Sequence, residues 1–153
     1  MQGAPPTFVP LDASRVEEFI GFVAAYYAFD SIPFDAETNR RGIQELISNP
    51  SYGRAWLIEH AGRAVGHVVL TFGFDLEFGG RQATVTELFI AEGSRSRGIG
   101  RRTLEFVESV LRAEGVRTLE LQVERNNTKA RALYERAGFV AHDRIPLSKR
   151  VLP

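Results

Sequence analysis

A strand-to-helix turn rich in glycine and arginine is the feature that most constrains the fold of this chain. Residues 95–101 read Arg-Ser-Arg-Gly-Ile-Gly-Arg. The apolar run at 85–90 predicts a strand before the turn, and the amphipathic run at 99–113 predicts a helix after it. Alternating apolar residues at 116–124 predict a second strand after that helix. Because a strand, a helix and a strand joined by one crossover form a parallel pair, part of the sheet must be parallel.

The same turn has the composition of an anion site. Gly98 and Gly100 allow a ligand to approach the backbone closely, because glycine carries no Cβ. The first N–H groups of the following helix have no partner within the helix, and the helix dipole favours negative charge there. A phosphate group is therefore the expected ligand of this turn.

The remaining periodicity predicts an α+β domain that spans residues 1–153. Helical spacing predicts a first helix after a cap at Asp12 or Ser14, and a second helix at 36–48. Three successive antiparallel strands are expected at 54–60, 64–74 and 83–90, a short helix at 128–137, and one or two closing strands at 139–151. These elements predict one mixed sheet with helices packed against it.

Composition narrows the class of protein. Hydrophobic residues make up 44% of the chain and charged residues 25%, as in ordinary soluble globular proteins. No apolar stretch reaches the roughly 20 residues of a membrane span, and no secretory signal is visible, so a cytoplasmic protein is expected. The absence of cysteine excludes disulfides and thiolate catalysis. The three histidines show no ligand spacing, so no metal site is expected.

Charge is unevenly distributed although the net charge is zero. Residues 1–90 hold six arginines against eleven acidic residues, and residues 91–153 hold eleven arginines and two lysines against eight acidic residues. This pattern is typical either of solvated helix faces or of a polyanionic ligand on the basic half and a cationic one on the acidic half. Because the basic residues are interleaved with acidic ones, nucleic acid is not an expected partner.

A second motif lies at 127–139 and on its own predicts only a capped helix. Asn127 can cap the first turn, and Gly138 can supply the left-handed residue that ends the helix. Taken alone, Tyr134 would be a packed aromatic side chain with its hydroxyl at the surface.

The two motifs together resemble the GNAT superfamily of N-acetyltransferases. The family's glycine turn, Gln/Arg-x-x-Gly-x-Gly/Ala, is similar to residues 95–100, and its strand before the turn is similar to Thr-Glu-Leu-Phe-Ile at 86–90. Its asparagine-to-tyrosine helix is similar to residues 127–139, and the resemblance covers about residues 53–151. It implies a GNAT-like mixed, mostly antiparallel sheet of about six to seven strands with a splayed central parallel pair, flanked by about four helices.

The resemblance also implies acetyl-CoA as the acetyl donor. Its pyrophosphate would lie on the turn and its pantetheine arm in the gap between the parallel strands, where the amide of Phe89 or Ile90 would stabilise the developing oxyanion. Asn127 would bond the pantetheine or hold the gap open, and Tyr134 would protonate the leaving thiolate. The residues implied at the cofactor are Leu88, Phe89, Ile90, Arg95, Ser96, Arg97, Gly98, Ile99, Gly100, Arg101, Asn127, Ala130 and Tyr134.

Glu87 is the candidate base, because it interrupts an apolar strand where partial desolvation would make its carboxylate a better proton acceptor. The alternatives are a glutamate paired with an arginine, an exposed glutamate, or a water path in its place. The acceptor is expected on the N-terminal third, where aromatic and acidic side chains either bind a cationic amine or belong to the core and the solvated surface. The selected candidates are Tyr27, Asp30, Phe34, Phe72, Asp75 and Glu87, with Tyr26, Asp35 and Glu77 as further ones.

We therefore expect an acetyl-CoA-dependent N-acetyltransferase that transfers acetyl directly to a primary amine, with a small cationic amine favoured. Two alternatives stay open at this point. One is an enzyme that modifies lysine or N-terminal amino groups of proteins, and the other is a module that binds acyl-CoA without turnover. No metal and no membrane partner is expected, and the resemblance is compatible with a homodimer.

Overall fold

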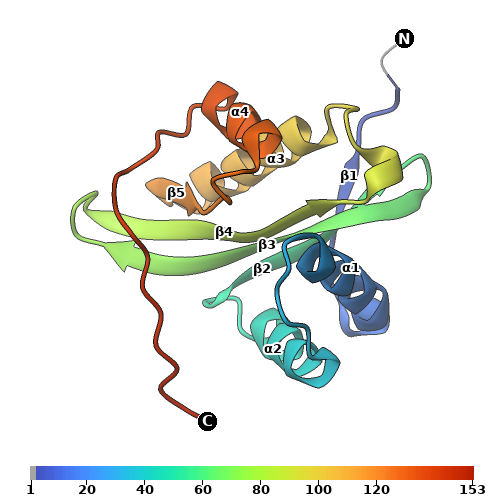
Figure 1. Ribbon diagram of the computed structural model, residues 1–153, viewed down its shortest axis with the longest axis horizontal. Helices are drawn as coiled ribbons and strands as arrows, with labels where there is room; N and C mark the ends of the chain where they lie inside the picture. Colours follow the sequence, from blue (N-terminus) through green and yellow to red (C-terminus); the bar gives the residue numbers. More distant parts are fainter. Residues whose placement is uncertain (1–2) are drawn as a thin grey trace.

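One five-stranded sheet organises the protein. The computed structural model describes residues 3–153. Its strands are β1 (Thr7–Pro10), β2 (Gly53–His60), β3 (Arg63–Asp75), β4 (Gly80–Ile90) and β5 (Thr118–Leu121). They lie in sequence order across the sheet, each antiparallel to its neighbour except β5, which runs parallel to β4 (Figure 1). The parallel pair that the crossover predicts is therefore confirmed.

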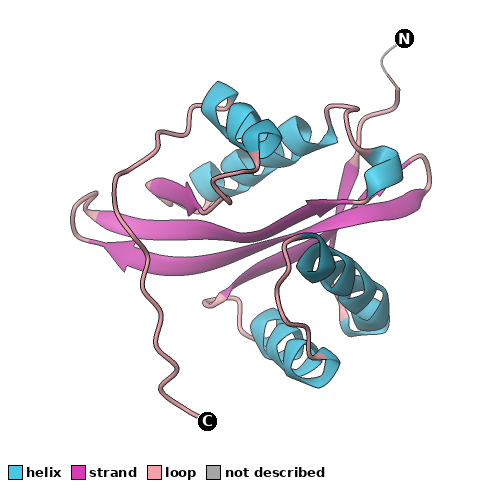
Figure 2. Ribbon diagram, in the orientation of Figure 1, coloured by secondary structure: helices cyan, strands magenta, loops and turns pink. Residues whose placement is uncertain are grey.

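Four α-helices within residues 3–153 cover the two faces of this sheet. Helices α1 (Val16–Phe29) and α2 (Ala36–Ser48) lie on one face, and α3 (Ile99–Ala113) and α4 (Thr128–Arg136) lie on the other (Figure 2). Alternation along the strands sends side chains to both faces. On the α3 side the buried core comprises Trp56, Ile58, Val68, Leu70, Val85, Ile99, Val107 and Leu111, with neighbours. On the α1–α2 side it comprises Phe19, Ile20, Val23, Ile43, Leu57 and Val69, with neighbours.

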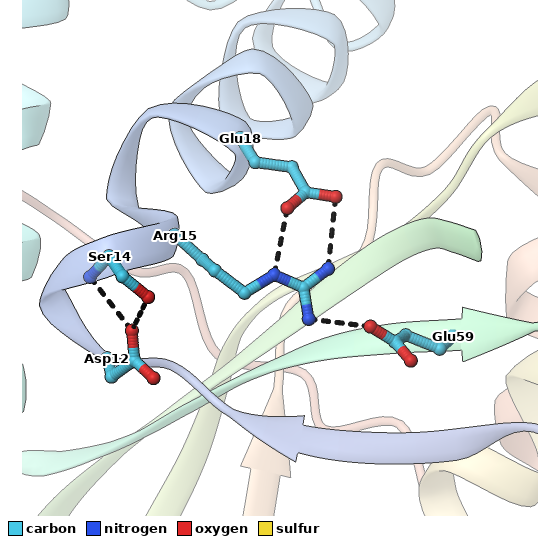
Figure 3. Close-up of polar contacts among 5 residues, drawn as sticks. All are labelled: Asp12, Ser14, Arg15, Glu18 and Glu59. Carbon is cyan, nitrogen blue, oxygen red and sulfur yellow. Dashed lines mark hydrogen bonds and ion pairs between the residues drawn. The ribbon is translucent and has the colours of Figure 1, made fainter. Parts of the chain in front are cut away.

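A short 3-10 turn, η1 (Ala13–Arg15), ties the start of α1 to the sheet. The Asp12 carboxylate accepts hydrogen bonds from the backbone N–H and the hydroxyl of Ser14. The Arg15 guanidinium donates to Glu18 of α1 at 2.9 Å and to Glu59 of β2 at 2.6 Å (Figure 3). One arginine thus links the first turn of α1 to strand β2.

The strand count and the C-terminal segment differ from the sequence prediction. The described residues form five strands rather than six to seven, and 139–153 contains no strand. Its apolar pattern is interrupted by the polar residues 142–144 and by Pro146, which lacks a backbone donor. The parallel pair consequently lies at an edge of the sheet and not at its centre. Strand β1 was not predicted, because four residues beside Pro10 are too few to show alternation.

The helix predictions are confirmed in number and position. Helices α2 and α3 have the predicted bounds, and α2 begins where the Asp35 carboxylate accepts a hydrogen bond from the Thr38 N–H at 2.7 Å. Strand β5 is shorter than the predicted 116–124, because its pairing with β4 stops after four residues.

Among residues 3–153, no helix combines the length and the apolar character that crossing a bilayer requires.

Candidate active site

The two parallel strands pair over only four residues. Their register runs from Gln82 opposite Thr118 to Val85 opposite Leu121. Strand β4 continues to Ile90, whereas β5 ends at Leu121 and the chain turns away toward α4. Within the described residues, 86–90 therefore has a strand neighbour only on the β3 side. An open strand edge of this kind can accept an extended ligand through backbone hydrogen bonds.

Backbone direction at the end of β4 places Ile90 on this open edge. The Ala91 N–H donates to the Val65 carbonyl of β3 at 2.7 Å, so strand alternation directs the N–H and carbonyl of Ile90 to the opposite edge. The Ile90 carbonyl accepts a hydrogen bond from the Arg95 Nε at 2.8 Å. By the same alternation the N–H groups of Leu88 and Ile90 face the gap, whereas that of Phe89 faces β3. This favours the Ile90 N–H over the Phe89 amide.

The glycine turn leads from the 3-10 turn η2 (Glu92–Ser94) into α3 through two left-handed residues. Ser96 has φ 62° and Gly98 has φ 76°. The first bond of the helix runs from the Arg102 N–H to the Gly98 carbonyl, and among the described residues no side chain caps this end. The N–H groups of the residues between them lack a partner within the helix, as an anion site requires.

Helix α4 lies against this turn. The Lys129 ammonium donates to the Ser96 hydroxyl at 2.7 Å, which adds positive charge beside the uncapped helix start. A Cβ added to Gly100 would lie 3.1 Å from the Leu133 side chain, so glycine permits the close approach of α3 and α4. The Asn127 Oδ1 accepts from the Ala130 N–H at 3.2 Å and caps α4 as the sequence predicts.

Arg95 points away from the helix start. Its guanidinium lies 4.6 Å from the Phe29 ring centre and 5.4 Å from that of Phe89. With its bond to the Ile90 carbonyl, the side chain braces the end of β4 against α1. It also forms part of the wall of an open cleft of about 780 Å³ between α1 and the end of β4. The Arg95 backbone N–H donates to the Glu92 carbonyl at 3.2 Å, so neither the side chain nor the N–H of Arg95 points to the start of α3.

Glu87 lies at the centre of a polar group on the α1–α2 side of the sheet. Its Oε1 lies 2.8 Å from the His67 Nε2, and its Oε2 accepts a hydrogen bond from the Tyr27 hydroxyl at 2.9 Å. The Tyr27 ring makes an edge contact with Phe34, 6.0 Å between centres. The carboxylate also borders a cavity of about 180 Å³ between α1, α2 and the sheet, together with Thr38 and Asn39.

Tyr26 interacts electrostatically with Glu87 on one side and with Tyr134 on the other. Burial raises the pKa of Tyr26, and the negative charges of Asp30 and Glu87 raise it further. Burial also raises the pKa of Tyr134, with a contribution from the Asp30 charge. The Tyr134 hydroxyl therefore stays protonated at neutral pH, and it lies within electrostatic range of the end of α1.

The structure does not bring Phe72 and Asp75 to this group. The Phe72 ring lies on the α3 side of the sheet, with the guanidinium groups of Arg54 and Arg81 at 5.2 and 4.7 Å from its centre. Asp75 lies at the end of β3, six positions beyond the residue that pairs with Glu87, and accepts from the Glu77 N–H. Of the selected acceptor candidates, Tyr27, Asp30, Phe34 and Glu87 lie together.

His67 is the site residue that sequence reasoning missed. It is fully buried, and the sequence offers a signal for it, since it interrupts the apolar run 65–70 just as Glu87 interrupts the next strand. Two polar residues in two adjacent apolar strands can meet when the register places them diagonally. In this register Glu87 pairs with Val69 and Phe89 pairs with His67, so His67 and Glu87 are diagonal neighbours across the two strands.

Comparison with known proteins gives consistent matches. A profile of the acetyltransferase (GNAT) family matches residues 23–139. The mycothiol acetyltransferase of Beutenbergia cavernae is 48% identical over 52 residues, which are 34% of this chain and 18% of that protein. The chain thus spans less than a fifth of that relative.

Solved structures match over nearly the whole chain. Integron cassette protein HFX_CASS3, from the mobile metagenome of Cole Harbour Salt Marsh, is 27% identical with a TM-score of 0.83, over 95% of this chain and 91% of that one. Aminoglycoside N-acetyltransferase AAC(6')-Iy, solved in complex with CoA, has a TM-score of 0.81 at 14% identity, over 98% of this chain and 97% of that one. At that identity, the second match bears on the fold alone.

Proposed function

We propose that this chain, which belongs to the acetyltransferase (GNAT) family, is an acetyl-CoA-dependent enzyme that transfers acetyl directly to the primary amine of a small cationic acceptor. The observation that carries the proposal is the open edge of β4. The Glu87 carboxylate, which is held by two partners, lies on this strand, and the half-buried side chain of Tyr134 lies on the helix that follows the gap.

The residues around the gap fit acetyl-CoA. The uncapped start of α3, with Gly98 in the left-handed conformation and Lys129 nearby, suits a pyrophosphate. The Ile90 N–H on the open edge suits a pantetheine amide or the thioester oxygen. When bound, acetyl-CoA supplies the thioester whose acetyl group is transferred.

The side chains supply the two proton transfers that the reaction needs. An alkylamine is mostly protonated at neutral pH, so Glu87 accepts its proton and leaves a nucleophilic nitrogen. That nitrogen forms a bond to the acetyl carbon as the carbon–sulfur bond breaks, and the Ile90 N–H stabilises the negative charge on the carbonyl oxygen. Tyr134, whose raised pKa keeps it protonated, donates its proton to the departing sulfur, and the surplus proton of the new amide nitrogen then restores the tyrosine hydroxyl.

The acceptor side favours a cation. Tyr26, Tyr27 and Phe34 provide aromatic faces, and Asp30 and Glu87 provide negative charge. Aromatic faces and carboxylates together stabilise an ammonium group. The cavity beside Glu87 has a volume of about 180 Å³, which suits a small amine. Of these side chains only Glu87 lines it, and the rest of its wall is mostly apolar, with Thr38 and Asn39 as the other polar residues.

A thiol-release assay over a panel of amines tests the proposal. The panel includes alkyl diamines, neutral hydroxylamines, aminoglycosides and a lysine peptide, each with acetyl-CoA. We expect CoA thiol to appear fastest with a small diamine. If acetyl-CoA binds and no amine releases thiol, the chain is a binding module and the proposal is wrong; release with the peptide alone would replace the small acceptor by a protein.

A further inference from the structure

We propose that His67 is a positioning residue that holds the Glu87 carboxylate for proton transfer, through a neutral ring protonated at Nε2. This inference rests on the proposed function, in which Glu87 accepts the proton of the amine. His67 itself touches no part of the gap, because its side chain is fully buried. Its effect on the reaction must therefore act through Glu87.

The contacts of the ring define its orientation. Nε2 lies 2.8 Å from the Glu87 Oε1. Phe19 packs edge-on against the ring at 4.8 Å between centres, and Tyr26 and Phe89 lie at 6.1 and 6.2 Å. Three aromatic side chains from α1 and β4 thus fix the plane of the imidazole, and its direct polar contact is with the carboxylate.

The proton on the ring follows from these contacts. An ionised carboxylate only accepts hydrogen bonds, so the nitrogen that faces it carries the hydrogen. Nδ1 is buried and has no hydrogen-bond partner among the described residues. A second proton there would leave a buried N–H without an acceptor, which is costly. His67 is consequently neutral with its hydrogen on Nε2.

The same geometry argues against a proton relay. A relay needs a group on the far side of the ring that takes the proton onward, and within the described residues the protein places none at Nδ1. The charged and titratable groups that face Glu87 are Tyr26 and Tyr27 from α1 and His67 from β3, while α2 contributes the uncharged Thr38 and Asn39. His67 and Tyr27 each bind one oxygen, so together they fix the direction of the carboxylate.

Two substitutions of His67 separate positioning from packing. His67→Leu removes the donor, and His67→Gln keeps an amide donor at a similar reach. We expect His67→Leu to lower kcat by about tenfold or more, as for loss of a hydrogen bond to a charged group, with KM for acetyl-CoA unchanged. The acidic limb of its pH–rate profile should move to higher pH, because a carboxylate that loses a donor is protonated more easily. His67→Gln should restore most of kcat and should return the acidic limb close to its wild-type pH.

His60→Leu serves as the matched control, since His60 lies on β2 and contacts the Ala4 carbonyl instead of a carboxylate. It should leave both kcat and the acidic limb unchanged. A His67→Leu variant that loses thermal stability but keeps the wild-type kcat and pH profile would overturn the proposal and assign His67 to packing.

A spectroscopic measurement tests the geometry without turnover. In ¹⁵N-histidine NMR spectra of the whole protein at neutral pH, we expect His67 to show a protonated Nε2 and an unprotonated Nδ1. Glu87→Gln should move the Nε2 resonance. A His67 that carries its hydrogen on Nδ1 would contradict the inference. If the predicted tautomer is found and the wild-type protein releases no thiol with any amine, the proposed function fails and the His67–Glu87 geometry stands.

Discussion

Tyr134 is the side chain on which the proposed protonation of the leaving thiolate depends. Tyr134→Phe removes only the hydroxyl, so we expect kcat to fall about 100-fold or more while the Kd of acetyl-CoA changes little. Thiol release at saturating amine and direct titration of acetyl-CoA measure the two quantities. Tyr52→Phe is the control, because Tyr52 is an exposed tyrosine outside this group. An equal loss of affinity and rate would assign Tyr134 to cofactor packing.

Asp30 controls the charge around Tyr134. Its negative charge contributes to the raised pKa of Tyr134, so Asp30→Asn should lower that pKa. The basic limb of the kcat–pH profile, where the donor loses its proton, should then move to lower pH. The KM of a diamine should rise in the same variant, since an ammonium loses a partner. If the basic limb did not move in Asp30→Asn, Tyr134 would not be the group that protonates the leaving thiolate.

The turn between β4 and α3 is the element that the donor proposal needs most. Gly98 has φ 76°, a conformation that costs an L side chain about 1–2 kcal/mol. Gly98→Val should therefore distort the turn and weaken acetyl-CoA binding by about tenfold or more. Gly115→Val is the matched control, because Gly115 has φ 72° at the other end of α3 and also has open space around its Cα.

Both glycine variants should lose a similar amount of stability in urea unfolding, and only Gly98→Val should lose affinity. The donor site would lie elsewhere if Gly98→Val bound acetyl-CoA as tightly as the wild-type protein does.

Elements with a strong local signal were predictable from the sequence, and those fixed by tertiary pairing were not. Helix α3 has both a helical apolar period and a glycine at each end, and its bounds were predicted correctly. The face to which Phe72 points depends on a register with an irregularity at Val69/Leu70, which no local pattern reveals. The partners of Glu87 come from β3 and α1, so the sequence could suggest the carboxylate but not the histidine and tyrosine that hold it.

Acidic side chains at the helix starts make the stability of the whole molecule depend on pH. Arginine partners lower the pKa of Glu17 and Glu18, and hydrogen bonds from N–H groups and hydroxyls lower that of Asp12 and Asp35. A carboxylate with a lowered pKa stabilises the fold above its unfolded-state pKa, and this contribution is lost as the pH falls through the folded-state value.

We therefore expect the urea midpoint to fall as the pH is lowered below about 5. The double variant Glu17→Gln/Glu18→Gln, which loses the ion pairs with Arg40 and Arg15, should show a weaker dependence. Added salt should reduce the difference, because exposed pairs are screened. An identical pH dependence in the double variant would show that these pairs contribute nothing to acid stability.

The distribution of charge over the molecule agrees with the two ligands of the proposed reaction. The basic C-terminal half holds the turn for an anionic donor, and the acidic N-terminal half contributes Asp30 and Glu87 to a cationic acceptor. Helices α1 and α4 lie on opposite faces of the sheet that contains the open edge of β4 (Figure 1). In the proposed reaction, the donor lies in this gap with its thioester between Glu87 and Tyr134.

Titration of acetyl-CoA into the ¹⁵N-labelled protein tests this placement most directly. Backbone amide shifts are followed across the chain, with the largest changes expected at Ile90 on the open edge and at residues 98–101 at the start of α3. Binding that leaves these amides unmoved and shifts others, such as those of the β3–β4 hairpin at 75–80, would contradict the account.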